Sequence, residues 1–167
     1  MSRTRADVLL VVRGLVESRA KARAAIEAGG VTADGARVMR ASDLVADGAA
    51  LHVEPAFPWV SRAGTKLAHA LDVFHVSPEG RVCLDVGAST GGFTQVLLQR
   101  GAHSVYAVDV GQGQLHPSLR DDPRVINLER TDARALTSAH LPQTPSLVVC
   151  DASFIGAAKV LAAPLSL

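Results

Sequence analysis

The chain has 167 residues, of which 48% are hydrophobic and 20% charged, and its formal net charge is +1. This length and apolar content fit one globular domain, or a small domain with part of a second, and exclude an intrinsically disordered chain. Because the net charge is close to zero, evidence for a nucleic-acid partner has to come from local clusters of basic residues.

No apolar run in the sequence is long enough to span a bilayer, and the N-terminus lacks the apolar core and small-residue cleavage site of a secretory signal. We therefore expect a cytoplasmic protein with no membrane partner. The two cysteines, Cys83 and Cys150, both lie in apolar runs, as small buried side chains do in a reducing compartment. The six histidines show no metal-ligand spacing, so no metal site is expected.

Residues 1–56 predict a small α+β domain. Apolar spacing favours helices from Asp7 to Leu15 and from Arg19 to Ala28, and Ser18 stands where it can cap the second helix. Short strands are expected at Val31–Ala33 and Leu51–Val53. The pattern is that of two helices followed by a small sheet.

Basic residues are concentrated at the start of this domain, ahead of most of its acids. The candidates for RNA contact are Arg3, Arg5, Arg13, Arg19, Lys21 and Arg23. A basic face of this kind attracts a phosphate backbone, but a solvated helix surface has the same composition. The stretch from Arg13 to Gly35 resembles the S4 RNA-binding domain. That resemblance implies that the domain binds structured RNA through its shape and backbone.

A linker is expected at residues 57–61, where Pro58 favours extended backbone. Trp59 is expected to pack one domain against the other. The helix that follows has an apolar stripe expected to be buried, formed by Leu67, Ala70, Leu71 and Phe74. Lys66 lies at the edge of this stripe, where a lysine is usually solvated, and taken alone it indicates no chemistry.

The rest of the chain, residues 62–167, alternates strands with helices or loops, which predicts an α/β domain with a parallel sheet. The expected strands are Val82–Val86, Val105–Val110, Val125–Leu128 and Leu147–Cys150. Ligands of such sheets bind beyond the carboxyl ends of the strands. Asp85, Asp109, Asp132 and Asp151 each stand at or just past an expected strand end. We therefore expect these acids to surround one ligand site, with Asp85 and Asp109 in contact with the ligand.

The first of these strands runs into a glycine-rich loop and then an apolar helix. The loop residues are Gly87, Ala88, Ser89, Thr90, Gly91, Gly92 and Phe93. We expect them to contact a ligand, because glycines let it approach the backbone and a helix N-terminus favours an anion. Their Gly-x-x-x-Gly-Gly spacing differs from the Gly-x-Gly-x-x-Gly of dinucleotide binders, which disfavours a dehydrogenase.

Asp109 follows this loop by about 20 residues, where a nucleotide site places an acceptor for ribose hydroxyls. Loop and acid together fit a ligand with a ribose and a compact zwitterionic tail, such as S-adenosylmethionine. A tight turn with solvated aspartates is the alternative interpretation of the same residues.

The same half of the chain carries a series of longer motifs. They are Ser61-Arg62-x-Gly64-x-Lys66-Leu67, Leu84 to Thr94, Tyr106 to Gly111, Gln114-Leu115, Leu119-Arg120, Glu129-Arg130-Thr131 and Asp151-x-Ser153-Phe154-Ile155. With the S4-like segment, they resemble the TlyA family, in which an S4 domain precedes an FtsJ-like methyltransferase domain. Members of that family are also called haemolysins, and the resemblance covers nearly the whole chain.

This resemblance implies 2′-O-methylation of cytidine in ribosomal RNA, with S-adenosylmethionine as the cofactor. The family's catalytic set is Lys-Asp-Lys-Glu, in which Lys66 matches the first lysine and Asp151 the aspartate. A ribose hydroxyl is a poor nucleophile, so a lysine held by a carboxylate can act as its base or orient its oxygen. The same match assigns the methionine part of the cofactor to Gly87–Phe93, its ribose to Asp109 and its adenine to Asp132, where the family often has Asn.

The match also predicts that the chain is the beginning of a longer enzyme, because the family's second catalytic lysine and its glutamate would lie beyond Leu167. Leu147–Cys150 is apolar at every position, as a strand covered on both faces is, and would here be an open edge. We therefore expect little activity and poor solubility from these residues alone. A non-catalytic S4-type RNA-binding protein is the alternative function. A membrane-active haemolysin is disfavoured, because no segment spans a bilayer.

Overall fold

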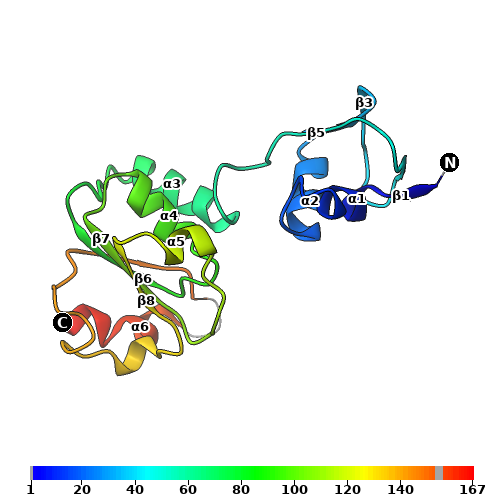
Figure 1. Cartoon of the computed structure of the whole chain (residues 1–167). Coiled ribbons are helices and arrows are strands. Elements are labelled where there is room, and N and C mark those ends of the chain that lie inside the picture. Colours follow the sequence, from blue (N-terminus) through cyan, green and yellow to red (C-terminus); the bar gives the residue numbers. More distant parts are fainter. Residues whose placement is uncertain (1, 153–155) are drawn as a thin grey trace. The chain divides into compact units, whose positions relative to one another are not determined.

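The computed structural model describes residues 2–152 and 156–167 (Figure 1). The chain divides into two compact units, one ending at Pro58 and the other running from Trp59 to Leu167. Each unit has a hydrophobic core of its own.

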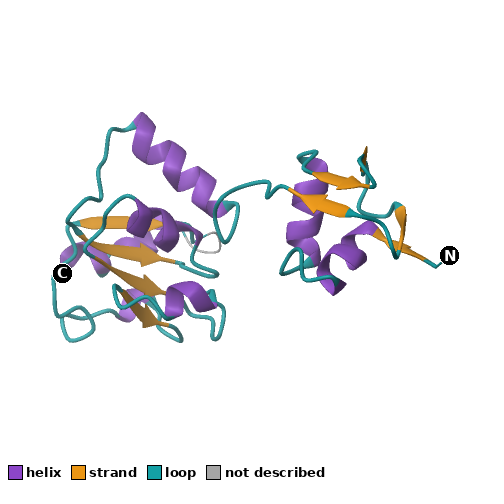
Figure 2. Cartoon of the chain, turned by 45° about the horizontal axis from the view of Figure 1, so that its top comes forward, coloured by secondary structure: helices purple, strands orange, loops and turns teal. Residues whose placement is uncertain are grey.

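The described residues of the first unit form two short helices and two small antiparallel sheets (Figure 2). The elements are β1 (Arg3–Arg5), α1 (Ala6–Val12), α2 (Arg19–Glu27), β2 (Val31–Ala33), β3 (Ala36–Arg37), β4 (Leu44–Ala46) and β5 (Leu51–Val53). β1 pairs with β4, and β2 lies between β3 and β5. Leu10, Ile26 and Val31 are fully buried and bring α1, α2 and β2 around one core.

The helices of this unit follow the prediction at α2 and depart from it at α1. Ser18 caps α2, because its hydroxyl accepts a hydrogen bond from the backbone nitrogen of Lys21. α1 ends at Val12 rather than Leu15, since Gly14 has a φ of 68° and turns the chain out of the helix. The strands β1, β3 and β4 are absent from the sequence-based prediction, whereas β2 and β5 have the bounds that it expects.

The described residues of the second unit form a four-stranded sheet with helices on both faces. The elements are α3 (Ala63–Val73), β6 (Val82–Val86), α4 (Gly92–Gln99), β7 (Ser104–Val108), α5 (Pro117–Arg120), β8 (Val125–Leu128), the 3₁₀ helix η1 (Ala133–Ala135), β9 (Leu147–Cys150), α6 (Ala157–Leu161) and the 3₁₀ helix η2 (Pro164–Ser166). The strand order is β8-β7-β6-β9, and every neighbouring pair is parallel. The α/β class and the parallel sheet are thus confirmed.

Side chains alternate across this sheet and build two apolar layers. Cys83 and Val105 belong to the cluster beneath α3 and α4, whereas Leu84 and Tyr106 belong to the cluster that includes Val160 of α6. Figure 1 shows α3 and α4 on one side of the strands and α6 on the other. Strands covered on both faces have to be apolar at nearly every position, which is why these runs are readable from the sequence. β9 lies at the sheet edge beside β6, as expected.

One expectation about the start of this unit is wrong. Leu67 and Leu71 on α3 are buried, but Phe74 caps the helix end and is 73% exposed, so it does not complete the buried stripe. The chain turns away there through His75, which has a φ of 53°, and Val76 packs on the core instead. Trp59 packs inside the second unit against Gly64 of α3, where a Cβ would collide with the indole.

Candidate active site

A cavity of about 750 Å³ opens beyond the carboxyl ends of β6 and β7. Its volume is in the range of small-molecule and cofactor sites, and its place is the one expected for the ligand of a parallel sheet. The predicted site residues that line it are Lys66, Gly87, Ala88, Ser89, Thr90, Phe93, Asp109, Asp132 and Asp151. Three further predicted residues, Asp85, Gly91 and Gly92, are not part of the lining formed by the described residues.

The glycine loop turns from β6 into α4 through left-handed backbone. Gly87, Ser89 and Gly91 have φ angles of 82°, 49° and 95°. A Cβ on Gly91 would collide with the Leu119 side chain, and one on Gly92 would collide with Ser61. Gly91 and Gly92 therefore allow the loop to pack closely on Leu119 and Ser61, whereas the residues before them line the cavity.

Asp109 follows β7 and connects the two loops that border the cavity. Its Oδ2 accepts a hydrogen bond from the Ser89 nitrogen at 2.8 Å, and its Oδ1 accepts one from the Gly111 nitrogen at 2.7 Å. Since a carboxylate offers about four acceptor positions, room remains for donors from a ligand. Asp109 can therefore hold the loops and accept hydrogen bonds from hydroxyl groups at the same time.

The two predicted catalytic residues meet at the cavity wall although they lie 85 positions apart in the chain. Lys66 projects from α3, and its Nζ lies 3.2 Å from both carboxylate oxygens of Asp151, which follows β9. The Lys66 side chain is 67% exposed and that of Asp151 35%, so the ion pair adds little to folding stability. The ion pair instead fixes the position of the Lys66 ammonium group at the cavity wall, where a bound ligand can contact it.

Asp132 caps η1 and forms an ion pair with Arg134. Its Oδ1 accepts a hydrogen bond from the Arg134 backbone nitrogen at 2.9 Å, and its Oδ2 lies 2.6 Å from the guanidinium. The side-chain hydrogen bond from Arg134 is the main cause that lowers the pKa of Asp132 to about 2. Both side chains line the cavity. At neutral pH this part of the wall therefore carries a balanced pair of charges.

Several lining residues are not singled out by the sequence analysis as site residues. They include Arg62, Gly111, Gln114 and Arg134. Arg62, Gly111 and Gln114 lie within the motifs of the family resemblance, and Arg134 follows Asp132 by two residues. These motifs, and the nearness of Arg134 to Asp132, are the sequence signals that could have identified them.

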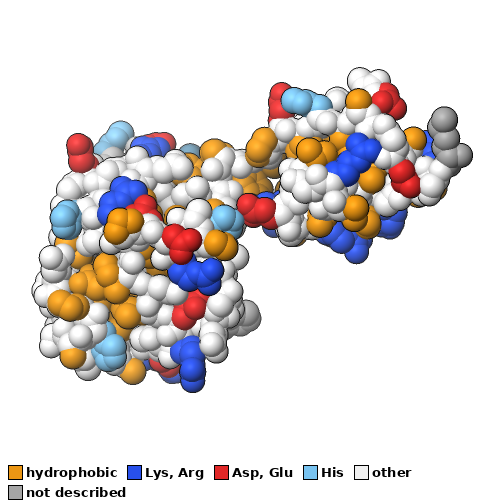
Figure 3. All heavy atoms as spheres, viewed as in Figure 1, with side chains coloured by type: hydrophobic (Ala, Val, Ile, Leu, Met, Phe, Trp, Pro, Cys, Tyr) orange, Lys and Arg blue, Asp and Glu red, His pale blue; other side chains and the backbone are white. Residues whose placement is uncertain are grey.

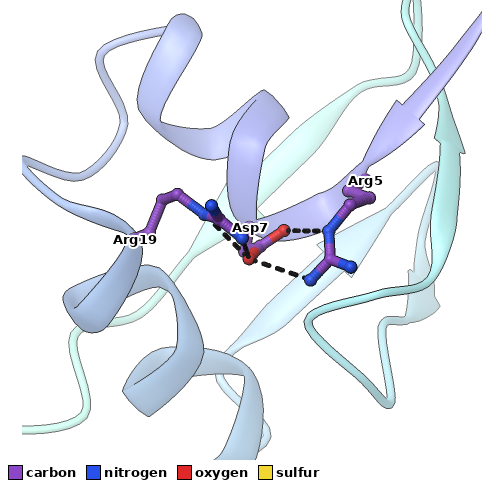
Figure 4. Close-up of polar contacts among 3 residues, drawn as sticks. All are labelled: Arg5, Asp7 and Arg19. Carbon is purple, nitrogen blue, oxygen red and sulfur yellow. Dashed lines mark hydrogen bonds and ion pairs between the residues drawn. The ribbon is translucent and has the colours of Figure 1, made fainter.

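In the first unit, Arg5 and Arg19 bind the buried carboxylate of Asp7 from two sides (Figure 4). Arg5 Nε lies 3.0 Å from Oδ1, Arg19 Nη2 lies 2.7 Å from Oδ2, and the Asp7 side chain has 0% exposure. The hydrogen bond from Arg5 is the largest cause that lowers the pKa of Asp7 to about 2. Both arginine side chains remain about half exposed, at 45% and 56%.

The other basic candidates of this unit divide into paired and exposed side chains. Arg13 donates to the backbone oxygens of Ala49 and Asp47, and Lys21 pairs with Glu17 at 2.7 Å. Arg3 and Arg23 are exposed. Figure 3 shows acidic side chains among the basic ones on the visible surface of this unit. The positive potential of the group is therefore weaker than its basic residues alone imply.

Comparison with known families agrees with these two units. Residues 59–167 match the family model described as FtsJ-like methyltransferase, and residues 4–51 match that of the S4 domain. The chain belongs to the FtsJ-like methyltransferase family. The resemblance read from the sequence is thereby confirmed for the FtsJ-like domain and for the S4 domain.

Curated relatives of this FtsJ-like chain are longer than the chain itself. It is 52% identical over 163 residues to the 16S/23S rRNA (cytidine-2'-O)-methyltransferase TlyA of Mycobacterium tuberculosis, covering 96% of this chain and 61% of the relative. It is 41% identical to Hemolysin A of Brachyspira hyodysenteriae, covering 93% of this chain and 65% of the relative. The chain thus spans about 61–65% of the length of these relatives.

Two solved structures are also similar to this chain in sequence and fold. A protein described as a hemolysin from Streptococcus thermophilus is 40% identical, with a TM-score of 0.68, over 98% of this chain and 61% of that chain. A second, from Lactococcus lactis, is 46% identical with a TM-score of 0.60, over 62% of this chain and 50% of that chain.

Asp85 of the FtsJ-like domain is buried and is not among the described residues that line the cavity. Its side chain is fully buried within β6, and its Oδ2 accepts a hydrogen bond from the Thr94 hydroxyl on α4 at 2.7 Å. Among the described residues its Oδ1 has no hydrogen-bond partner. Burial is the largest cause that raises the pKa of Asp85 to about 7. Asp85 therefore joins the strand to the helix that follows the glycine loop.

We expect Asp85→Asn to remove a pH dependence of stability from the FtsJ-like domain. The folded-state pKa of about 7 lies above the usual value of 3.8, so the unfolded chain loses this proton first and stability falls as pH rises between these values. Between pH 5 and pH 8 the loss is on the order of 3 kcal/mol, because stability falls by about 1.4 kcal/mol per pH unit from pH 5 up to the folded-state pKa of about 7. Urea unfolding followed by the fluorescence of Trp59 at pH 5 and pH 8 measures it. Equal pH dependence in both proteins would contradict the assignment.

Three residues of the family motif, Ser153, Phe154 and Ile155, lie outside the described residues. Within residues 2–152 and 156–167, no group of three or more His, Cys, Asp or Glu is placed to hold a metal ion. In the same residues, no helix combines the length and the apolar character needed to cross a membrane.

Proposed function

We propose that this chain is the S4 domain and part of the methyltransferase domain of an enzyme that methylates the 2′-hydroxyl of a cytidine in ribosomal RNA. The observation that carries the proposal is the cavity in which the Lys66–Asp151 ion pair faces the glycine loop and Asp109. The name of the mycobacterial relative, a 16S/23S rRNA (cytidine-2'-O)-methyltransferase, supports the same reaction. Since the chain spans 61% of that relative, the activity is proposed for the whole protein.

The residues of the cavity fit S-adenosylmethionine. Gly87–Thr90 expose backbone at the start of α4, where a carboxylate of the methionine part is favoured by free N–H groups. Asp109 retains acceptor positions for the two hydroxyls of a ribose. Asp132 and Arg134 offer both an acceptor and donors to an adenine edge. When bound, S-adenosylmethionine supplies a methyl group that is activated by its sulfonium.

Lys66 would bind the ribose hydroxyl that receives the methyl group. Its ammonium is held by Asp151 and is 67% exposed, so desolvation has to come from the RNA that covers it. In that position the Lys66 ammonium can donate a hydrogen bond that orients the hydroxyl oxygen toward the methyl group, and Asp151 keeps Lys66 in place. A role as base requires that the covered ammonium first lose its proton to solvent, after which the neutral amine can accept the hydroxyl proton. Alignment of the two reacting atoms then accounts for much of the acceleration.

The S4 domain would supply the contact with ribosomal RNA. Arg3 and Arg23 are exposed, and Asp7 holds Arg5 and Arg19 with about half of their side chains open to solvent. Guanidinium groups fixed in this way bind phosphate with little loss of side-chain entropy. An enzyme that acts on ribosomal RNA or ribosomal subunits in this way would work in the cytoplasm.

Calorimetric titration of this chain with S-adenosylmethionine tests the cofactor half of the proposal. We expect saturable binding to one site, comparable binding of S-adenosylhomocysteine and none of NAD. Binding of NAD instead, or of neither ligand, would reject it. The same titration distinguishes the methyltransferase from the alternative, a non-catalytic RNA-binding protein. Such a protein would bind ribosomal RNA in a filter assay but would not bind S-adenosylmethionine.

A further inference from the structure

Glu129, directly after β8, accepts hydrogen bonds from three consecutive backbone nitrogens. The Gly113 nitrogen donates to Oε2 at 2.8 Å, and those of Gln114 and Leu115 donate to Oε1 at 2.8 and 3.0 Å. The donors lie in the loop between β7 and α5, outside any helix or strand. Hydrogen bonds to an ionised carboxylate are stronger than neutral ones, so Glu129 fixes the path of this loop.

Two further contacts close the same loop onto the segment after β8. The Arg130 nitrogen donates to the Gly111 oxygen, and the Thr131 nitrogen donates to the Asp109 oxygen, both at 2.9 Å. The loop therefore begins at Asp109 and is held along its length by residues 129–131.

The fixed loop in turn contacts the cavity and the glycine loop. The Gln114 side chain lines the cavity. Leu115 is 3% exposed and packs so closely on Gly91 that a Cβ there would be 2.8 Å from it. The next residue, His116, donates its backbone N–H to the Thr90 oxygen at 3.1 Å. A shift of the loop would therefore move both the Gln114 side of the cavity and the glycine loop.

We propose that Glu129 is a positioning residue of the ligand site, which sets the place of Gln114 and of the glycine loop without touching the ligand. Glu129 itself is not part of the cavity lining among the described residues. The backbone hydrogen bonds, that of Leu115 first, lower the pKa of Glu129 to about 2, so its carboxylate stays charged wherever the protein is folded and assayed. The proposal rests on the proposed function for the identity of the ligand, S-adenosylmethionine.

Glutamine is the informative replacement at this position. It has the size of glutamate, but only one of its two terminal atoms accepts hydrogen bonds, and its NH₂ group would face the Gly113 nitrogen. A matched control is Asp122→Asn at the opposite end of β8. Asp122 also accepts a backbone hydrogen bond, from the Arg124 nitrogen at 2.9 Å, and it forms an ion pair with Arg124 at 2.8 Å.

The experiment compares Glu129→Gln and Asp122→Asn with the parent chain by calorimetric titration with S-adenosylmethionine, at a temperature where circular dichroism shows all three folded. We expect Glu129→Gln to raise the dissociation constant by about tenfold or more, the change produced by losing roughly one such interaction. We expect Asp122→Asn to stay within twofold of the parent. Equal dissociation constants for Glu129→Gln and the parent would overturn the proposal.

Amide hydrogen exchange without ligand keeps this test separate from the proposed function. If Glu129 positions the site, Glu129→Gln loses protection at Gly113–Leu115 and also at Ser89 and Gly111, which bind Asp109. Loss confined to Gly113–Leu115 would overturn the positioning role. If the parent does not bind S-adenosylmethionine, the proposed function fails, and the exchange pattern alone decides the role of Glu129.

Discussion

Replacing Lys66 by methionine is expected to slow methyl transfer to ribosomal RNA by about 10²–10⁴-fold, the range usually contributed by a positioned acid–base group. Methionine keeps an unbranched apolar side chain and removes the ammonium that Asp151 holds at 3.2 Å. Because Lys66 would act on the hydroxyl of the RNA and not on the cofactor, the affinity for S-adenosylmethionine should stay within twofold. Transfer of labelled methyl groups in single-turnover assays, using a form extended to the length of the relatives, measures the change.

Asp151→Asn is the companion variant, because it removes the charge that holds Lys66 and leaves a side chain of the same shape. Residues that act as one unit lose activity together, so the double variant should be little slower than Lys66→Met alone. Methyl transfer by Lys66→Met within threefold of the parent rate would show that Lys66 has no part in the reaction.

The second large effect is expected from Asp109→Ala, which should weaken the binding of S-adenosylmethionine by about a hundredfold or more. Two ribose hydroxyls would lose a charged acceptor, at roughly 1.5 kcal/mol or more each. The Ser89 and Gly111 nitrogens would also lose the acceptor that joins the two loops. Calorimetric titration of this chain measures the loss directly.

Two control variants sharpen this measurement. Asp109→Asn keeps one acceptor oxygen and should fall between the parent and Asp109→Ala. Asp121→Ala removes an exposed acid at the end of α5, outside the cavity lining, and should bind as the parent does. If Asp109→Ala bound the cofactor as tightly as Asp121→Ala, the ribose assignment would be wrong.

Part of this fold can be predicted from the sequence. The strands β6, β8 and β9 have the predicted bounds, because a parallel strand covered on both faces must be apolar throughout. The glycine loop and Asp109 were placed at one site by the rule that neighbouring parallel strands end at the same edge. The S4 and FtsJ-like domains followed from motifs whose spacing is specific.

Other features depend on contacts between distant residues, which local patterns do not record. From the sequence, Arg5 and Arg19 are candidates for RNA contact with no partner indicated. In the fold, both form ion pairs with Asp7. The sequence places Asp85 at a strand end, but only the fold shows that its side chain is buried and accepts a hydrogen bond from Thr94. It expects Phe74 in the core, but the turn at the end of α3 leaves it exposed.

The sequence by itself determined the class of fold, the positions of the apolar strands along the chain and the residue types at the site. Each of these follows from periodicity or from a short motif. Only the tertiary structure decided which of those residues share the cavity. Lys66 and Asp151 are joined by the packing of α3 beside a sheet in which β9 lies next to β6, across 85 positions of chain. Pairings of that separation arise from the whole core, because no local segment fixes the distance between them.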